Sequence, residues 1–347
     1  MTNISKEHSL DFKNDFIANF LHAVANSEAS EFTRRTMTEH YIDAVLFHHP
    51  NSANLDHKQI QTKVIKLINR IFDELALLNN KPQQLATRLL ELGRKQQSRI
   101  PEWFVEFDEA YDHYKKISKL PFIGSFLLPY MQATQSLLDF GCGDGEIAMY
   151  LGKELGLSSV AGVDVIDWRS DSNRNNPNFV FYEHNFVTNN SNDIPAHDTG
   201  LMHAMLHHVS REPAKIVEYL LRAKNAINGQ ILVVEDVLFD AKLHVSNFPG
   251  IESLNQTRNS QPNFAEYLAK PVEVQRDVIT ILDLLSNSLA MGIPEMNFPF
   301  GAQEINTWGD IFQMAGLKMR TLKVLGFQDH LFHRMSQVLF VLETNDS

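Results

Sequence analysis

Residues 139–145 form the pattern in this chain that most directly suggests chemistry. Asp139 is followed by glycine at positions 141, 143 and 145. Because glycine has no Cβ atom, glycines at every second position let the backbone approach a bulky ligand closely. The apolar residues before the pattern predict a buried strand, and those after it predict a helix, whose first N–H groups have no partner within the helix. This order is typical of the nucleotide sites of open α/β sheets.

Polar residues also follow the next predicted strands. Asp164 ends a second strand about twenty residues after the glycine turn, where a carboxylate can accept two hydrogen bonds from ribose hydroxyls. Asn185 follows a third predicted strand at 179–184, and Ala204 lies at the end of a fourth at 200–205. Simpler interpretations stay open: an ordinary tight turn for the glycines, a strand-end cap for Asp164 and a turn residue for Asn185.

One further residue could remove a proton from a hydroxyl group, and a second could support it. His207 comes directly after the fourth strand, and Glu235 lies in the fifth, predicted at 231–237. Imidazole is the side chain most often used as a general base, and a neighbouring carboxylate can orient it and favour its charged form. The alternatives are a polar helix-start residue for His207 and a helix cap for Glu235. His208 remains a second candidate to face a substrate.

The glycine pattern with Asp139 resembles motif I of the class I S-adenosylmethionine-dependent methyltransferases, whereas a dinucleotide-binding turn would show G-x-G-x-x-G. The resemblance implies S-adenosyl-L-methionine as the cofactor, with Asp139 bonded to its ammonium directly or through water. It also implies that Asp164 holds the ribose, that Asn185 contacts the adenine amino group and that Phe186 lies against the base. The residues that the resemblance places at the cofactor are Asp139, Gly141, Cys142, Gly143, Asp164, Val165, Asn185, Phe186 and Ala204.

Residues 205–212 resemble two methyltransferase patterns. One is L-H-H-[VL], found in many small-molecule methyltransferases, in which the histidines need not be catalytic. The other is the L/C-H-D-W-S-D-E segment of the plant-type O-methyltransferases, which implies His207 as the general base and Glu235 as a flanking acid. The chain departs from the plant-type pattern at His208, where the family has Asp, and at Thr307, where the family has a second Glu.

These resemblances imply a methyltransferase that acts on a small molecule, most simply at oxygen with a His base. The alternatives are N- or C-methylation, and a protein that binds the cofactor without transferring its methyl group. Nucleic-acid methylation is disfavoured because no [DNS]-P-P-[YFW] segment follows the fourth strand and the only cysteine lies in the glycine turn. A net charge of −11 also opposes binding to nucleic acid. The sequence does not identify the acceptor.

The order of the predicted elements indicates an α/β fold. Strands at 137–140 and 160–165 flank a helix at 147–155, and the alternation that follows predicts a Rossmann-like, mostly parallel, seven-stranded methyltransferase sheet with helices on both faces. Residues 1–100 predict an all-α amino-terminal domain of about four helices, which would act as a lid or as the contact of a homodimer. Residues 101–347 predict the methyltransferase domain.

Within that domain, residues 240–300 predict a helical insertion that lies beside the carboxyl ends of the strands as a substrate lid. The insertion is expected to contain a polar linker at 255–263 and a helix at 272–289. Before it, a helix is expected at 213–227, ended by Asn228 and Gly229.

Composition favours a cytoplasmic protein. The single cysteine, Cys142, cannot form an internal disulfide, which fits a reducing compartment. No stretch approaches the ~20 apolar residues of a membrane span, and residues 1–11 lack the apolar core of a signal peptide, so no membrane partner is predicted. Asp329, His330 and His333 form too weak a pattern for a metal site, and no metal is predicted.

Overall fold

The computed structural model describes residues 18–78, 109–110, 113–189, 194–240, 248–285, 299–327 and 335–344. The chain divides into two compact units. One contains residues 1–116, 265–300 and 327–335, and the other contains residues 117–264, 301–326 and 336–347. The predicted insertion is therefore shared, because residues up to 264 belong to the second unit and residues 265–300 belong to the first. The predicted domain boundary at residue 100 lies outside the described residues and stays a prediction.

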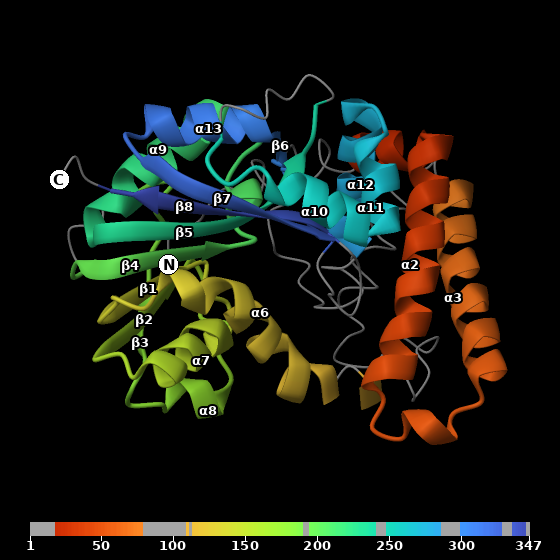
Figure 1. Cartoon of the computed structure of the whole chain (residues 1–347), viewed down its shortest axis with the longest axis horizontal. Coiled ribbons are helices and arrows are strands. Elements are labelled where there is room, and N and C mark those ends of the chain that lie inside the picture. Colours follow the sequence, from red (N-terminus) through yellow and green to blue (C-terminus); the bar gives the residue numbers. More distant parts are fainter. Residues whose placement is uncertain are drawn as a thin grey trace, which may run out of the picture. The chain divides into compact units, whose positions relative to one another are not determined.

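The second unit is built on one twisted sheet with the strand order β3-β2-β1-β4-β5-β8-β7 (Figure 1). Its strands are β1 (Ser136–Phe140), β2 (Ser159–Asp164), β3 (Val180–Glu183), β4 (His197–His203), β5 (Ile227–Leu238), β7 (Lys318–Phe327) and β8 (Ser336–Glu343). Neighbouring strands from β3 to β5 are parallel, and β8 is antiparallel to β5. A two-residue strand, β6 (Gln303–Glu304), pairs with the end of β5 and adds to the seven predicted strands. The predicted α/β fold class is confirmed.

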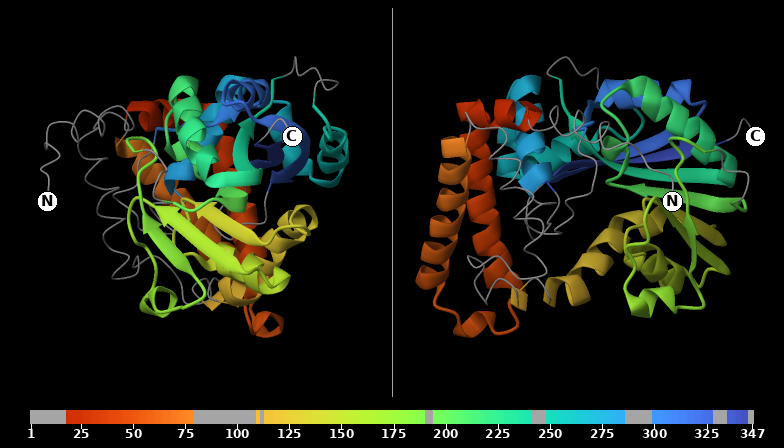
Figure 2. Two further views of the ribbon diagram at one scale, coloured as in Figure 1. Left: turned by 90° about the vertical axis from the view of Figure 1, so that its left-hand side faces the viewer. Right: turned by 180° about the vertical axis from the view of Figure 1, so that it is seen from behind.

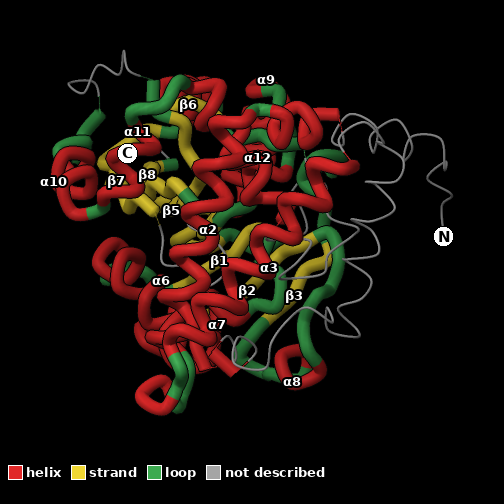
Figure 3. The backbone as a smooth tube through the Cα atoms, turned by 90° about the vertical axis from the view of Figure 1, so that its right-hand side faces the viewer, coloured by secondary structure: helices red, strands yellow, loops and turns green. Residues whose placement is uncertain are grey.

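The strand order creates the place where a ligand could bind. The chain runs outward from β1 to β2 and β3 (Figure 3), and it then returns to the other side of β1 as β4 (Figure 1). The connections after β1 and β4 therefore leave the sheet in opposite directions at its carboxyl edge. A crevice at such a point of reversal is the usual ligand site of open α/β sheets.

Helices cover both faces of this sheet (Figures 1 and 2). Helices α6 (Leu120–Leu127) and α7 (Glu146–Leu155) lie on one face, and α9 (Pro213–Ala223) and α13 (Ile305–Met314) lie on the other. Apolar side chains of α6 and α7 pack with inward-facing residues of the central strands. Burial on both faces explains why Val233 and Val234, which are neighbours in β5, are both fully buried.

The predicted polar linker at 255–263 is wrong, because most of it is helix α10 (Ser253–Ser260). This polar helix satisfies backbone groups of β7, at the end of the strand order. Thr257 Oγ1 donates to the carbonyl of Val324 (3.0 Å), and Gln261 Nε2 donates to that of Leu325 (3.4 Å). The polar composition that predicted a loop is thus explained by side chains that cover a sheet edge.

Asn228 and Gly229 do not end the preceding helix, as the sequence predicted. Helix α9 ends at Ala223, and a short 3₁₀ turn, η6 (Lys224–Ala226), leads directly into β5. Gly229 lies inside β5, where its carbonyl accepts from the N–H of Thr344 (3.0 Å). A Cβ at Gly229 would lie 2.6 Å from the carbonyl oxygen of Asp198, so close backbone packing requires the glycine there.

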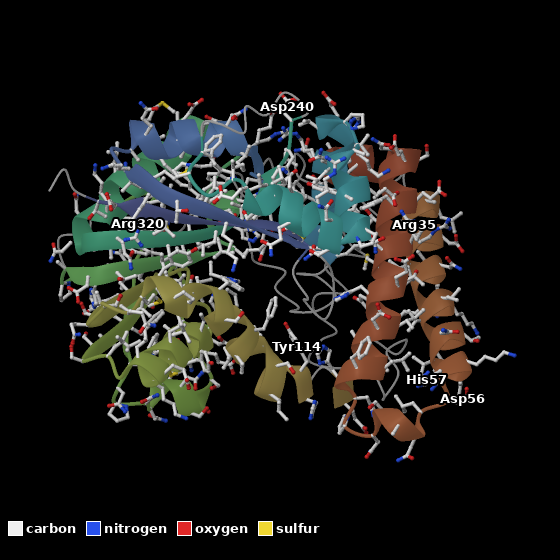
Figure 4. The ribbon with its side chains drawn as sticks, viewed as in Figure 1. Arg35, Asp56, His57, Tyr114, Asp240 and Arg320 are labelled. Carbon is white, nitrogen blue, oxygen red and sulfur yellow. The ribbon has the colours of Figure 1, made fainter. Side chains whose placement is uncertain are left out.

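The described amino-terminal part of the first unit is mainly helical, as predicted. Helices α2 (Ser27–His48) and α3 (His57–Leu78) form a hairpin, and α12 (Val272–Leu285) packs against α2. Two hydrogen bonds of 2.6 Å from Arg35, labelled in Figure 4, to the carboxylate of Glu266 join two distant parts of this unit. The end of the helix predicted at 272–289 and the further helices expected before residue 100 lie outside the described residues. Across the described ranges, no helix is long and apolar enough to cross a membrane.

Candidate functional site

The turn between β1 and α7 holds three glycines with left-handed backbone angles. The angle φ is +68° at Gly141, +54° at Gly143 and +77° at Gly145, a region that costs other residues roughly 1–2 kcal/mol. The N–H of Gly141 donates to the carbonyl of Val163 in β2 (2.8 Å), and the N–H of Gly145 donates to that of Cys142 (2.9 Å). The first bond holds the turn against the neighbouring strand at the carboxyl edge of the sheet, and the second closes the turn on itself.

The space around Gly143 differs from that around the other two glycines. A Cβ at Gly145 would lie 2.9 Å from the ring of Phe179, and one at Gly141 would lie 3.0 Å from the Cβ of Met205. A Cβ at Gly143 would meet no described atom within 4 Å. The backbone of Gly143 therefore borders open space, as expected where a ligand approaches the main chain.

Asp139, near the end of β1, is a buried carboxylate that is only 3% exposed. Within the described part of the chain, this carboxylate takes part in no hydrogen bond or ion pair. Burial raises the pKa of Asp139 well above its usual value, and the negative charges of Asp164 and Asp144 raise it further. A charge in such a place is unfavourable unless a cation or a hydrogen-bond donor reaches it. Asp139 therefore fits a cationic ligand group.

Asp164, at the end of β2, is held by backbone groups around the glycine turn. Its Oδ2 accepts from the N–H of Gly143 (3.0 Å), and its Oδ1 accepts from the N–H of Val165 (2.7 Å). Burial raises the pKa of Asp164, and the hydrogen bonds from backbone groups oppose the increase. Because each carboxylate oxygen has two lone pairs, both can still accept a bond from a ribose hydroxyl. Val165 is 53% exposed beside it.

The residues after β3 divide between a turn and the core. Asn185 Oδ1 accepts from the N–H of Val187 (2.9 Å), as a turn residue does, and keeps a second lone pair. Phe186 is 2% exposed, and its ring centroid lies 5.3 Å from that of Phe140 and 5.7 Å from that of Tyr219. Phe186 therefore packs against rings from β1 and α9, and its expected contact with an adenine base stays a prediction.

Cys142 fills a crowded place beneath the turn. Its side chain is buried in the apolar cluster between the sheet and helices α6 and α7. A Cβ at Gly162 would lie 2.6 Å from the Sγ atom, so the glycine in β2 makes room for the thiol. Burial raises the pKa of this thiol, and the negative charges of Asp139 and Asp164 raise it further. Because a neutral thiol is a poor nucleophile, Cys142 is not a candidate nucleophile, and its expected place at the cofactor stays a prediction.

Ala204, directly after β4, has φ +52°, which is uncommon for a residue with a Cβ atom. Its N–H donates to the carbonyl of Val234 in β5 (2.8 Å), which holds the chain in this conformation. The 3₁₀ turn η5 (Leu206–His208) follows. Strained backbone of this kind is frequent at functional sites, where surrounding contacts maintain it.

Glu235 and His207 meet at this turn, as the sequence analysis anticipated. Glu235 Oε2 lies 2.6 Å from Nδ1 of His207, and its Oε1 accepts from the N–H groups of Met205 (2.8 Å) and Leu206 (2.5 Å). Glu235 is fully buried, and the side chain of His207 is 5% exposed. The ring of His208 lies 4.1 Å from that of His207, centroid to centroid, and is less buried.

An ionised carboxylate can only accept hydrogen bonds, so Glu235 determines which nitrogen of His207 carries the proton. The bond to Oε2 requires a hydrogen on Nδ1. In the neutral ring the lone pair then lies on Nε2. The arrangement can therefore present Nε2 as the atom that takes up a proton, with the resulting positive charge next to Glu235.

Two residues near these groups were missed by the sequence analysis. His203, the last residue of β4, has its pKa lowered to about 4, first by burial and then by the positive charge of Lys119. The phenol pKa of Tyr219 in α9 is raised by burial and by the charges of Asp164 and Asp139. Neither residue belongs to a local motif, and both effects depend on neighbours from other elements. The weak metal pattern of Asp329, His330 and His333 lies outside the described residues.

No protein-family model matches the sequence, and a search of curated proteins likewise gave no match. Solved structures with a similar fold include the pyocyanin biosynthetic protein PhzM, at 11% identity and a TM-score of 0.43, over 68% of this chain and 58% of that one. The mitomycin 7-O-methyltransferase MmcR matches at 11% identity and a TM-score of 0.44, over 86% of this chain and 74% of that one. An O-methyltransferase family protein from Burkholderia thailandensis matches at 12% identity and a TM-score of 0.41, over 69% and 59%.

The matched regions cover 58% and 59% of the length of two of these three proteins. Two of the three are named as O-methyltransferases. At identities of 11–12% and TM-scores of 0.41–0.44, these matches do not assign the chain to a family. We therefore base the functional proposal on the residues of the site.

Proposed function

We propose that the chain is an S-adenosylmethionine-dependent methyltransferase that methylates a small molecule, with oxygen as the accepting atom and His207 as the base. The observation that carries this proposal is the buried carboxylate of Asp139, which has no partner within the described residues and lies beside a left-handed glycine turn. A ligand for this place must bring a cation to Asp139 and pass close to the backbone of Gly143.

S-adenosylmethionine meets both requirements, because its amino-acid part carries an ammonium and is slender enough to lie along a glycine backbone. When bound, it supplies a methyl group on a positively charged sulfur. Asp139 would hold the ammonium, and the backbone of Gly141, Cys142 and Gly143 would line the amino-acid part. The ammonium would offset the unfavourable burial of the Asp139 charge.

The other cofactor contacts follow from the carboxyl ends of the neighbouring strands. Asp164, with Val165 beside it, would accept bonds from the ribose hydroxyls, because both of its oxygens keep a lone pair. Asn185 Oδ1 would accept from the adenine amino group in addition to the N–H of Val187. Ala204 would lie near the cofactor at the end of β4, where its strained backbone starts the turn that carries His207.

For transfer to oxygen, a proton must leave the acceptor hydroxyl. Glu235 holds the hydrogen of His207 on Nδ1, so the proton of the hydroxyl would go to Nε2. The fully buried carboxylate would then stabilise the imidazolium. If the acceptor is an amine or a carbon atom instead, the same residues could orient it, so O-methylation is the most specific part of the proposal.

One observation favours a second candidate, a protein that binds the cofactor without transferring its methyl group. His207 is almost fully buried, and its bond to Glu235 could serve only to hold the turn in place. The two candidates differ in turnover. A methyltransferase transfers labelled methyl groups from S-adenosylmethionine to components of a small-molecule extract, whereas the alternative protein binds the cofactor and transfers none.

Asp139→Asn tests the cofactor site. Isothermal titration should show that the wild-type chain binds S-adenosylhomocysteine, and that the variant binds it roughly 10- to 150-fold more weakly, as expected for the loss of a bond to a charged partner (about 1.5–3 kcal/mol). At neutral pH the unliganded variant should be more stable than the wild type, because the pKa of Asp139 is raised and its ionised form is disfavoured by folding.

Asp171→Asn, at an almost fully exposed carboxylate, is the matched control and should change neither quantity. Equal affinity of the wild-type chain and Asp139→Asn for S-adenosylhomocysteine would remove Asp139 from the proposed site. The predicted homodimer through the amino-terminal helices and the predicted cytoplasmic location stay predictions.

A further inference from the structure

The turn after β3 is held from one side by helix α9. Arg222, in the last turn of α9, donates from Nη1 to the carbonyl oxygen of Phe186 (2.9 Å) and to that of Val187. The Arg222 side chain is 29% exposed; its bond to Phe186 is partly buried, and its bond to Val187 lies at the surface. Bonds from a charged donor are roughly twice as strong as bonds between neutral groups. The guanidinium therefore restrains two successive carbonyls of a segment that belongs to no helix or strand.

Tyr219, one helical turn before Arg222, provides a second contact from the same helix. Its ring packs edge-on against Phe186, with a centroid distance of 5.7 Å. Beyond Phe186, burial does little to hold the turn, because Val187 is 47% exposed and the next two residues are also exposed. The polar bonds of Arg222 therefore restrain the outer part of the turn from outside, in addition to the bonds that residues 187–189 make to Asn185.

The same turn sets the position of Asn185. The Oδ1 of Asn185 accepts from the N–H of Val187, and the Asn185 carbonyl accepts from the N–H of Asn189 (2.8 Å). Val187 thus has its N–H bonded to the Asn185 carboxamide and its carbonyl bonded to Arg222. A shift of Val187 would move the carboxamide oxygen directly.

We infer that Arg222 is a positioning residue for recognition of the adenine base. This inference rests on the proposed function, in which Asn185 Oδ1 accepts from the adenine amino group. Arg222 does not touch the base in this arrangement. It fixes the carbonyls of residues 186 and 187, and through Val187 it holds the Asn185 oxygen where the amino group can donate to it.

Isothermal titration of the full chain tests this inference with two ligands. One is S-adenosylhomocysteine, and the other is its analogue with hypoxanthine in place of adenine, which lacks the amino group. The wild-type chain should prefer the adenine ligand. Arg222→Met should weaken binding of S-adenosylhomocysteine roughly tenfold or more and should reduce the preference over the analogue. Arg222→Lys, which keeps a charged donor, should recover part of both.

Lys215→Met is the matched control, because it removes a cation from the same helix, and Lys215 pairs with Glu212 and not with the turn. It should bind both ligands as the wild type does. Thermal unfolding of the unliganded variants separates positioning from stability, because a merely structural role would lower the melting temperature and leave the dissociation constants of the folded protein unchanged. If Arg222→Met does not fold, the milder Arg222→Gln takes its place with the same expected direction.

The possible failures can be told apart. If the wild-type chain does not bind S-adenosylhomocysteine, the proposed function fails, and this inference fails with it. If the wild-type chain binds and prefers the adenine ligand, but the folded Arg222 variants keep the same affinity and preference, then only the role of Arg222 is overturned.

Discussion

Replacement of Glu235 by Gln is the most direct test of the arrangement around His207. The wild-type carboxylate accepts three hydrogen bonds, from the N–H groups of Met205 and Leu206 and from Nδ1 of His207. In the variant, one oxygen becomes an amide nitrogen, which donates instead of accepting. If the remaining oxygen still accepts from the N–H groups of Met205 and Leu206, the amide nitrogen faces the N–H on Nδ1 of His207. Two donors then face each other, and the N–H of His207 loses its acceptor.

The expected cost follows from these bonds. A bond to a charged group contributes about 1.5–3 kcal/mol and a neutral one about 0.5–1.5 kcal/mol, so the loss of one bond and the weakening of two others cost several kcal/mol in total. The variant no longer buries the charge of Glu235, and this gain offsets part of the cost. We expect Glu235→Gln to lower the free energy of unfolding by about 1–3 kcal/mol. Glu235→Ala should lower it by about 3–5 kcal/mol, because it leaves three buried donors without their acceptor.

Urea denaturation at neutral pH measures these differences, and nitrogen NMR of the imidazole reports which ring nitrogen carries the proton. In Glu235→Gln, His207 should lose its preference for a hydrogen on Nδ1, because Nδ1 can then accept from the new amide. Glu212→Gln, at an exposed carboxylate paired with Lys215, is the matched control and should cost at most ~1 kcal/mol. The reasoning would be refuted if Glu235→Gln kept wild-type stability and a proton fixed on Nδ1.

Two further predictions concern pH dependence and the glycine turn. Burial and the charge of Lys119 lower the pKa of His203 to about 4, against about 6.5 in the unfolded chain, so the folded state resists protonation that the unfolded state accepts. The free energy of unfolding should therefore fall by up to about 3 kcal/mol as the pH drops from 6.5 towards 4. Denaturation curves of His203→Gln should show a weaker dependence of this free energy on pH in that window. An unchanged dependence on pH would contradict this reasoning. Gly145→Ala should lose more stability than Gly143→Ala in urea denaturation, because the new Cβ meets the ring of Phe179 at 2.9 Å, whereas Gly143→Ala should mainly weaken titrated binding of S-adenosylhomocysteine. Equal losses in both variants would argue against the open space at Gly143.

Much of the fold could be predicted because the decisive signals are local. The strand predicted at 137–140 is β1 (Ser136–Phe140), and the helix predicted at 147–155 is α7 (Glu146–Leu155). Short apolar runs, with glycines at the turn between them, limit these elements whatever their surroundings. Polar composition wrongly predicted a linker where polar side chains bond to another part of the chain, as α10 does to β7. The pair Asn228–Gly229 misled because sheet packing, not a helix end, requires the glycine.

The sequence by itself determined which residues reach the carboxyl edge of the sheet, because the residues that end successive parallel strands must meet there. Asp139, Asp164 and the left-handed glycines belong to this group. The tertiary structure decided how these and other residues interact. The register of β4 on β5 brings His207 to Glu235 across 28 positions, and the packing of α9 brings Arg222 to the carbonyl of Phe186 across 36. Burial among residues of several elements packs Phe186 against Phe140 and Tyr219 and lowers the pKa of His203. Such effects depend on neighbours distant in the chain, which local sequence patterns do not specify.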